Sequence, residues 1–404
     1  MKPFSFIHIA DIHLGYEQYN LSVRREDFAR AFHEAVEKTL ELKPDFMIIA
    51  GDLFHQARPS NKTLENAVQN FRRLKEAGIP VLVVDGSHDA APNVITGTIL
   101  NPLDSAGLIY YLPRHENACW ENDSCYVYGI PNFRTRQRTE HQLPAFYELK
   151  KPKPYGDKFN IFVFHMALDI PEIMKGRPST FAEASPDYMP GGFDYYAGGH
   201  LHTPWQLPFK GSLLVYSGST ETVSYEDANV EKGFYYVEVN GKDDVEIERV
   251  KLNSPRPFKI LESNFTGYSP QRITEETIEI VKKNDEPGVI LIPVLKGTLP
   301  AEASRSEIDL GRIRGAAEQA LLVRPVVLMR EESLPAEIVQ SIFQSSLENL
   351  KTKAFEYFNE FFSKRYEKKR AEKIARLAVE LVQPLVKGNE ENVRSLLEGL
   401  FDED

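Results

Sequence analysis

The chain has 404 residues, with 42% hydrophobic and 26% charged residues, which is typical of a globular protein of two or three domains. Its formal net charge of −11 argues against indiscriminate binding to nucleic acid, although local charge and bound metal decide that property. The first residues, MKPFSFIHIADIHLG, lack the apolar core of a signal peptide, and no apolar run is long enough to span a bilayer. The two cysteines, Cys119 and Cys125, predict reduced cytoplasmic thiols and no disulfide framework.

Short apolar runs alternate with helical patterns between residue 4 and about residue 240. Helical spacing of apolar residues predicts one helix after the first run, and a second from Leu64 to Leu74 that ends before Gly78 and Pro80. The alternation predicts a layered α/β sheet, which later strands close with antiparallel members. The runs that predict buried strands of this sheet lie at 4–10, 46–50, 81–84, 160–164 and 195–197, and the later strands at 213–216, 233–239 and 245–252.

The pattern changes after residue 255, and we therefore expect four segments. Residues 1–255 form the core, and residues 256–331 predict strand, helix, strand, helix and strand, which is a compact α+β module. Residues 332–350 predict a linker with a short helix near 338–343. In the tail, residues 351–404, apolar residues at helical spacing with one gap predict one long helix to about residue 387 and a short helix after it.

Histidine and aspartate residues cluster directly after five of the predicted strands. In an open α/β sheet, the carboxyl ends of the strands line the crevice where ligands bind. A single histidine in such a place is usually structural, but five clusters in succession indicate one shared site. The clusters are Asp11-Ile12-His13, Gly51-Asp52-Leu53-Phe54-His55, Gly86-Ser87-His88-Asp89, Phe164-His165 and Gly199-His200-Leu201-His202.

The donor atoms of these clusters define the chemistry that we expect. Three carboxylates and six imidazoles occur, and no thiolate is among them. Such nitrogen and oxygen donors suit manganese, iron or zinc, and exclude an iron–sulfur or cysteine-rich zinc site. The ligands are too many for one tetrahedral ion. Two ions roughly 3.5–4 Å apart can stabilise both the attacking and the leaving oxygen of an in-line phosphoryl displacement.

The order of these motifs resembles that of the calcineurin-like metallophosphoesterases. Within that superfamily, the stretches 8–16 (HIADIHLGY), 51–55 (GDLFH), 216–221 (YSGSTE) and 232–235 (KGFY) are similar to those of the Mre-eleven/SbcD nucleases of double-strand-break repair, archaeal type. The resemblance extends over the whole chain. It implies a β-sandwich flanked by helices, a small DNA-binding cap and a helical tail.

The resemblance also implies two manganese ions and a role for each site residue. His88 stabilises the transition state and protonates the leaving oxygen, His55 orients the phosphate or His88, and Asp89 fixes the tautomer of His88. The implied ligands are Asp11, His13 and His202 for one ion, His165 and His200 for the other, Asp52 as the bridge between both, and the residue at position 87.

Ser87 departs from the family's pattern, in which this position is usually asparagine and its amide oxygen ligates the second ion. A serine hydroxyl is shorter and a weaker neutral donor, so a water can fill the gap. We still expect Ser87 at the second metal.

Basic residues near the predicted site suggest contacts with a DNA backbone. The candidates are Arg58 and Ser60, which follow the Asp52 loop, and Arg134 and Arg136 in the basic stretch FRTRQRTE. A solvated loop explains the second pair equally well. Contacts to phosphates position a protein on DNA without reading its bases, so no base-specific recognition is expected.

The tail has an aromatic stripe that either packs on the chain's own core or docks onto a partner. No G-x-x-x-x-G-K-[ST] loop occurs, so any ATP dependence must come from another chain. The resemblance implies a Rad-fifty/SbcC-like coiled-coil ATPase as that partner, and a homodimer through the helix at 62–77 or the segment 94–103. The expected partner-binding residues are Phe355, Phe358, Phe362, Tyr366, Leu377, Leu381, Leu396 and Leu400.

Three functions are compatible with these features. The first is a manganese-dependent nuclease with 3′–5′ exonuclease and endonuclease activity on DNA ends, in the cytoplasm at the nucleoid. The second is a phosphomonoesterase or cyclic-nucleotide phosphodiesterase on the same scaffold. The third is a catalytically weak DNA-bridging scaffold for the ATPase, which Ser87 suggests.

Overall fold

The computed structural model describes residues 1–91, 97–300, 303–331, 347–363 and 366–386. It divides into two compact units. The first comprises Met1–Ile260, Glu286–Ile292 and Gln319–Leu321, and the second comprises Leu261–Asp285, Pro293–Glu318 and Leu322–Asp404.

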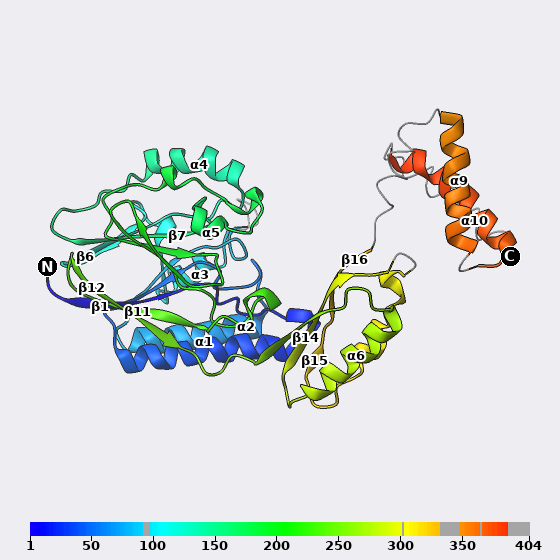
Figure 1. The fold of residues 1–404 in the computed structure, drawn as a ribbon. Coiled ribbons are helices and arrows are strands. Elements are labelled where there is room, and N and C mark those ends of the chain that lie inside the picture. Colours follow the sequence, from blue (N-terminus) through cyan, green and yellow to red (C-terminus); the bar gives the residue numbers. More distant parts are fainter. Residues whose placement is uncertain (92–96, 301–302, 332–346, 364–365, 387–404) are drawn as a thin grey trace. The chain divides into compact units, whose positions relative to one another are not determined.

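Two six-stranded sheets form the centre of the first unit (Figure 1). In the first sheet, three parallel strands carry a fourth parallel strand at one edge and an antiparallel hairpin at the other. Its order is β12 (Asp244–Lys251), β11 (Gly233–Gly241), β1 (Phe4–Ile9), β2 (Phe46–Ala50), β3 (Val81–Val84) and β4 (Tyr110–Tyr111).

The second sheet has four parallel strands in its middle and an antiparallel strand at each edge. Its order is β5 (Cys119–Glu121), β6 (Cys125–Gly129), β7 (Phe159–His165), β8 (Tyr195–Gly199), β10 (Ser212–Tyr216) and β9 (Trp205–Phe209). The layered sandwich with antiparallel closing strands is therefore confirmed, but the sequence did not show that the strands divide between two sheets. A strand buried on both faces has the same apolar pattern in either sheet, so the pattern could not show where the sheets divide.

Apolar side chains fill the space between the two sheets and cover their outer faces. Phe6, Ile48 and Val84 of the first sheet share a core with Val127 and Ile161 of the second. Figure 1 shows α1 and α2 on one side of the sandwich and α4 on the other. The helices are α1 (Ser22–Leu42), α2 (Asn61–Glu76), α3 (Leu100–Ser105), α4 (Arg136–Leu149) and α5 (Pro171–Met174), with 3-10 turns at η1 (Gln18–Asn20), η2 (Leu112–Arg114), η3 (Ser179–Phe181), η4 (Pro186–Tyr188) and η5 (Tyr225–Asp227).

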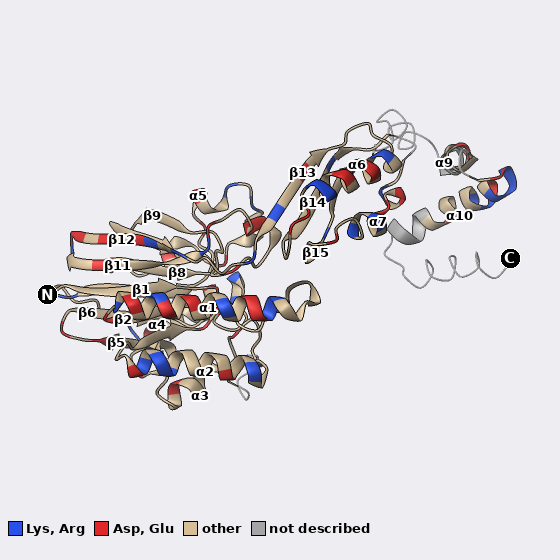
Figure 2. Ribbon diagram, turned by 90° about the horizontal axis from the view of Figure 1, so that it is seen from below, with Lys and Arg blue, Asp and Glu red and all other residues tan. Residues whose placement is uncertain are grey.

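Local sequence explains the placement of α2, which follows the Asp52 loop. The Ser60 hydroxyl accepts a hydrogen bond from the Thr63 N–H (3.2 Å) and caps the helix. Phe71 and Leu74 are fully buried and anchor α2 on the sheet. Gly78 follows the helix at φ 76°, a left-handed conformation that glycine adopts without strain. In the turned view of Figure 2, basic and acidic residues are interspersed along α1 and α2, so neither helix presents a uniformly basic face.

The second unit follows the predicted order of strand, helix, strand, helix and strand, but its second helix ends at Arg314 and an extra short strand precedes the last one. Its sheet pairs β13 (Phe258–Asn264, which starts in the first unit) with β14 (Ile290–Thr298), and β14 with β15 (Leu322–Val323) and, in parallel, with β16 (Val326–Arg330). Helix α6 (Pro270–Lys283) buries Ile273 and Val281, and α7 (Leu310–Arg314) buries Ile313. A 3-10 turn, η6 (Arg305–Glu307), precedes α7.

Two helices make up the described part of the tail: α9 (Leu347–Ser363) and α10 (Lys368–Val386). The guanidinium of Arg376 in α10 lies 5.5 Å from the ring centroid of Phe355 in α9, so the two helices face each other. The prediction of one long helix is wrong, and α9 begins inside the predicted linker. The rest of that linker, its short helix, and the last helix with Leu396 and Leu400 lie outside the described residues. Among the helices described, none is long and apolar enough to cross a membrane.

Candidate metal centre

The predicted site residues come together at one edge of the sandwich. Parallel strands β1, β2 and β3 of the first sheet and β7 and β8 of the second end there. Each strand carries one of the predicted clusters at its carboxyl end, so residues far apart in sequence become neighbours. Three groups of side chains place their donor atoms within 4.8 Å of one another: Asp11 with His13 and His202, Asp11 with Asp52 and His165, and His13 with His55 and His88.

Two glycines allow the loops to approach this closely. A Cβ atom on Gly86 would lie 2.1 Å from the Oδ1 atom of Asp52, and one on Gly51 would lie 2.3 Å from the Nδ1 atom of His165. Neither distance is possible for a carbon atom, so any other residue would push the ligands apart. Gly51 and Gly86, which begin the Asp52 and His88 motifs, therefore allow close packing around Asp52.

The Asp52 carboxylate is the centre of the cluster. Its Oδ2 atom lies 3.3 Å from the Nε2 atom of His165, 3.8 Å from that of His13 and 4.0 Å from that of His88. Its Oδ1 atom accepts a hydrogen bond from the His88 backbone N–H (2.9 Å). Asp11 accepts from the His200 N–H at 3.0 and 3.2 Å.

The histidine rings are held by the nitrogen that points away from the centre. Nδ1 of His165 bonds the Ala50 carbonyl (2.8 Å), and Nδ1 of His88 bonds the His55 carbonyl (3.0 Å). Because a carbonyl only accepts, Nδ1 carries a proton in both rings, and Nε2 is the nitrogen that faces inward and can bind metal once it has no proton. His165 Nε2 is buried and makes no hydrogen bond to a described residue, as expected of a ligand atom that lacks its cation.

Electrostatics also fit a cation site. Burial lowers the pKa of His13 well below its usual value, whereas the pKa of Asp52, despite burial, is held well below its usual value by His165 and His13. Burial alone would lower the pKa of His165 too, but the Asp52 and Asp11 carboxylates raise it to about 10. In the protein alone, a proton on His165 thus supplies the positive charge that these carboxylates require. A divalent ion would supply it instead, since metal binding displaces protons from its ligands.

His55 contacts both His13 and His88, and its Nδ1 atom lies 3.4 Å from the Nδ1 atom of His13. The His55 and His88 rings stack at 4.6 Å, and His55 stacks on Tyr16 at 3.7 Å. His88 is 40% exposed, so it is open to a substrate. The prediction that Asp89 fixes the tautomer of His88 is wrong: its carboxylate accepts from the Gly86 N–H (2.7 Å) in its own loop and from the Phe54 N–H (3.2 Å) in the loop after β2.

Two acidic residues near the site were missed by the sequence analysis. Asp227 Oδ2 lies 3.0 Å from His202 Nδ1, and Glu183 Oε2 lies 3.7 Å from His200 Nε2. Burial raises the pKa of Glu183 to about 7. Neither residue follows a predicted strand. The only sequence signal at Asp227 is its spacing from Ser224, which is typical of a helix cap and says nothing of a ring.

The four predicted DNA-contact residues differ in whether their side chains already have partners within the chain. Arg58 is exposed, and Ser60 is the cap of α2. Arg134 donates to the Ala90 carbonyl (2.8 Å), and Arg136 is paired with Glu140 (3.1 Å) and with Asp169 (3.2 Å). The structure thus gives both arginines of the second pair partners within the chain.

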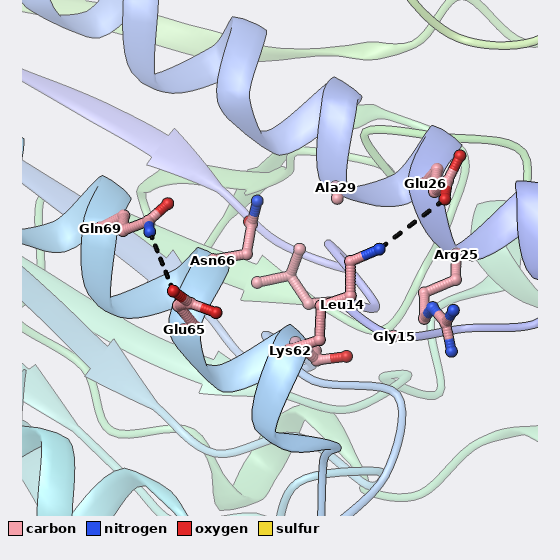
Figure 3. A pocket seen from close by; sticks show the side chains of 10 residues that line it. Leu14, Gly15, Arg25, Glu26, Ala29, Lys62, Glu65, Asn66 and Gln69 are labelled. Carbon is pink, nitrogen blue, oxygen red and sulfur yellow. Dashed lines mark hydrogen bonds and ion pairs between the residues drawn. The ribbon is translucent and has the colours of Figure 1, made fainter.

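A cavity of 210 Å³ lies between α1 and α2 (Figure 3). Leu14, Gly15 and Ala29 line it, and Lys62 with Glu26 stand at its rim. It borders the loop after Asp11 and His13, but none of the candidate metal ligands lines it. We therefore place the chemistry at the strand ends and not in this cavity.

Comparison with known proteins identifies the family of the chain. Residues 4–204 match the model of the calcineurin-like phosphoesterases, a class of dinuclear metal-dependent enzymes. The chain is 32% identical to the DNA double-strand break repair protein Mre11 of Archaeoglobus fulgidus over 338 residues, which is 77% of this chain and 72% of that protein. It is 25% identical to the Mre11 protein of Methanococcus maripaludis over 89% of this chain and 100% of that protein. The chain belongs to the Mre11 family.

Among solved structures, a dimetal phosphatase from Danio rerio matches 62% of this chain and 99% of its own, with 11% identity and a TM-score of 0.35. That agreement is too low to carry an argument.

Proposed function

We propose that the protein is a manganese-dependent nuclease that processes the ends of DNA double-strand breaks, as an exonuclease in the 3′–5′ direction and as an endonuclease. One observation carries the proposal: the Nε2 atoms of His13, His88 and His165 all face the Asp52 Oδ2 atom at 3.3–4.0 Å. Membership of the Mre11 family supports DNA as the substrate. Nitrogen and oxygen donors without a thiolate suit manganese, iron or zinc, and the resemblance to the family selects manganese among them.

The donor set fits two divalent ions, for which we propose the ligands that the sequence predicts. Asp11, His13 and His202 hold one ion and His165 and His200 the other, with Ser87 beside it and Asp52 between both. When bound, two such ions stabilise negative charge on the attacking and leaving oxygens of a phosphodiester. The carboxylates are in place before metal arrives, because histidine nitrogens and backbone N–H groups already hold them.

His88 is the group that we propose to protonate the leaving oxygen. Its fixed tautomer leaves Nε2 as the atom that exchanges a proton with substrate, and its exposure lets it reach one. His55 acts through its carbonyl and its stacked ring, which keep the His88 imidazole in one orientation.

The competing activity is hydrolysis of small phosphate esters on the same scaffold. Turnover of end-labelled duplex DNA and of bis(p-nitrophenyl) phosphate, measured side by side in manganese, separates the two. We expect nucleotides to be released from duplex ends at enzyme concentrations where the small ester is hydrolysed slowly. Efficient hydrolysis of the ester with intact DNA would contradict the proposal, and so would failure on both substrates, which favours the scaffold function.

For the domains, we propose a nuclease core at 1–255, a DNA-binding cap at 256–331, a linker from 332 and an ATPase-binding tail. Arg58 is the best candidate for a phosphate contact, because it is exposed and follows the Asp52 loop. Ser60, Arg134 and Arg136 are weaker candidates, since each already has a partner in the chain. The substrate places the protein in the cytoplasm, at the nucleoid.

The tail is proposed to bind a Rad-fifty/SbcC-like ATPase. Phe358 and Phe362 stack at 6.2 Å along α9, and Tyr366 after it is 43% exposed. Phe355, Phe358 and Phe362 remain half-buried although α10 packs against α9. The same holds for Leu377 and Leu381 on α10. An aromatic stripe that its own helical partner covers only in part suits docking onto a second chain.

A homodimer is proposed through α2 and α3. A groove of 810 Å³ runs between these helices, and the apolar side chains Leu64, Val68, Pro102 and Leu103 line it. The two segments considered from the sequence, 62–77 and 94–103, therefore both contribute residues to this groove. Sedimentation of the wild type and of Val68→Glu tests the dimer: we expect the variant to be a folded monomer, and an unchanged dimer would exclude this surface.

A further inference from the structure

The carboxylate of Asp227 lies outside the proposed ligand set but contacts one of its members. Asp227 ends η5, and its side chain is 6% exposed. Its Oδ2 atom is 3.0 Å from Nδ1 of His202, and its Oδ1 atom is 3.2 Å from Nζ of Lys232. Lys232 is itself buried and donates to the Ser219 hydroxyl at 3.0 Å.

We infer that Asp227 is a positioning residue that fixes the tautomer of His202, and that Lys232 fixes Asp227. The inference rests on the proposed function in one respect, the role of His202 as a metal ligand. It also gives a role to Ser219 and Lys232, which contact no substrate or metal in the proposed mechanism.

The hydrogen-bonding properties of Asp227, Lys232 and His202 support this inference. An ionised carboxylate only accepts hydrogen bonds, so the neutral His202 ring must carry its proton on Nδ1. Nε2 is then a bare lone pair, and it lies 3.4 Å from His13 Nε2 and 3.9 Å from Asp11 Oδ1, where the first ion is proposed. In an imidazole without a carboxylate partner, neither tautomer is selected. Asp227 therefore presets the one tautomer that can bind metal.

Lys232 determines how a substitute for Asp227 must be oriented. An ammonium only donates, and the Lys232 side chain is 4% exposed, so it requires an acceptor. In Asp227→Asn, this charge-assisted bond should draw the amide oxygen to Lys232, ahead of the longer contacts of 3.3 Å from the Val223 and Ser224 N–H groups. The amide NH₂ then faces His202, which has to accept on Nδ1 and carry its proton on Nε2.

The first test reads the tautomer directly, in metal-free protein with ¹⁵N-labelled histidine above pH 8. Ring ¹⁵N shifts of His202, assigned with His202→Gln, should show Nδ1–H in the wild type and Nε2–H in Asp227→Asn. The double variant Asp227→Asn/Lys232→Met should return to Nδ1–H, because the amide oxygen is then free to face the ring. Asp187→Asn, an exposed aspartate at η4, is the matched control and should change nothing.

The second test measures metal affinity by manganese electron paramagnetic resonance on the same proteins. Asp227→Asn should weaken the tighter site by roughly 10–100-fold, and the double variant should recover most of that loss. Unchanged His202 shifts in Asp227→Asn, or a double variant that is no better than the single one, would overturn the inference and leave Asp227 as a cap of η5. If Asp227→Asn does not fold, the double variant and Asp227→Glu decide the question by the same readouts.

Failure of the proposed metal site gives a different result. In that case His202→Gln binds manganese as the wild type does, while the tautomer of His202 still follows Asp227 and Lys232.

Discussion

Asp11, His13 and Asp52 hold their backbones in the left-handed region, at φ values of 52°, 49° and 50°. None is a glycine, so each conformation costs on the order of 1–3 kcal/mol that the surrounding structure must offset. The cost is offset locally: the Asp11 N–H donates to the Gly51 carbonyl (3.2 Å), and the His13 N–H donates to the Asp52 carbonyl (2.9 Å). These cross-strand bonds tie two of the proposed ligand loops together.

Ser87 is the residue at which the proposed site departs from its family, and it yields the first prediction. If the second ion lacks an amide ligand here, Ser87→Asn should lower the manganese concentration for half-maximal cleavage by roughly 10–100-fold, the usual cost of losing one supporting group. Titration of manganese against cleavage rate for both proteins measures the effect. Overlapping curves would mean that the hydroxyl or an ordered water already replaces the amide.

His8, in the core between the two sheets, makes the stability of the protein depend on pH. Its Nδ1 atom bonds the Tyr195 hydroxyl at 2.9 Å, and its Nε2 atom is buried without a hydrogen bond to a described residue. Burial, together with the positive charge of Arg249, lowers the pKa of His8 from 6.5 to about 3. The unfolded chain therefore binds a proton that the folded chain excludes, so this contribution to stability is complete above pH 6.5 and is lost as the pH falls toward 3.

The second prediction follows from this difference in proton binding between the folded and the unfolded chain. Below pH 6.5, the free energy of unfolding of the metal-free wild type should fall more steeply than that of His8→Gln, by up to about 1.4 kcal/mol per pH unit. Urea denaturation of both proteins at several pH values between 7 and 4 provides the slopes. Parallel slopes would show that His8 is protonated in the folded protein.

At the scale of elements, the apolar pattern of the tail predicted one long helix where the structure has two. The spacing of aromatic and aliphatic residues continues from Phe355 to Leu385 with one gap, between Tyr366 and Ile374. The chain leaves the helix after Ser363 and α10 begins at Lys368, next to that gap. Two helices can then bury part of their stripes against each other, which a single straight helix cannot do.

The third prediction concerns this tail. Removal of residues 347–404, from the start of α9, should leave manganese-dependent cleavage of short DNA intact and abolish binding to the ATPase, because the proposed site lies entirely in the first unit. Co-purification and a cleavage assay on the same preparation measure both properties. An aggregated core would instead mean that the stripe of α9 belongs to the core.

At the scale of the molecule, the sequence predicted the strands and the clustering of the candidate ligands better than the hydrogen bonds that orient their rings. Each metal-ligand motif follows a run of buried strand residues, and that combination can be recognised without a structure. Which ring nitrogen faces the centre could not be predicted, because it depends on the Ala50 and His55 carbonyls and on Asp227. These partners are ordinary residues whose role comes only from where the fold places them.

The central claim is that the Asp52 cluster holds the metal ions that cleave DNA. Its most direct test is release of label from a 3′-end-labelled duplex in manganese, by the wild type and by Asp52→Asn, with bound metal measured in both. Asp52→Asn keeps the shape of the side chain but removes its charge, so we predict a folded protein whose metal content falls and whose cleavage drops by at least ~100-fold. Cleavage at the wild-type rate by a folded Asp52→Asn protein would contradict the account.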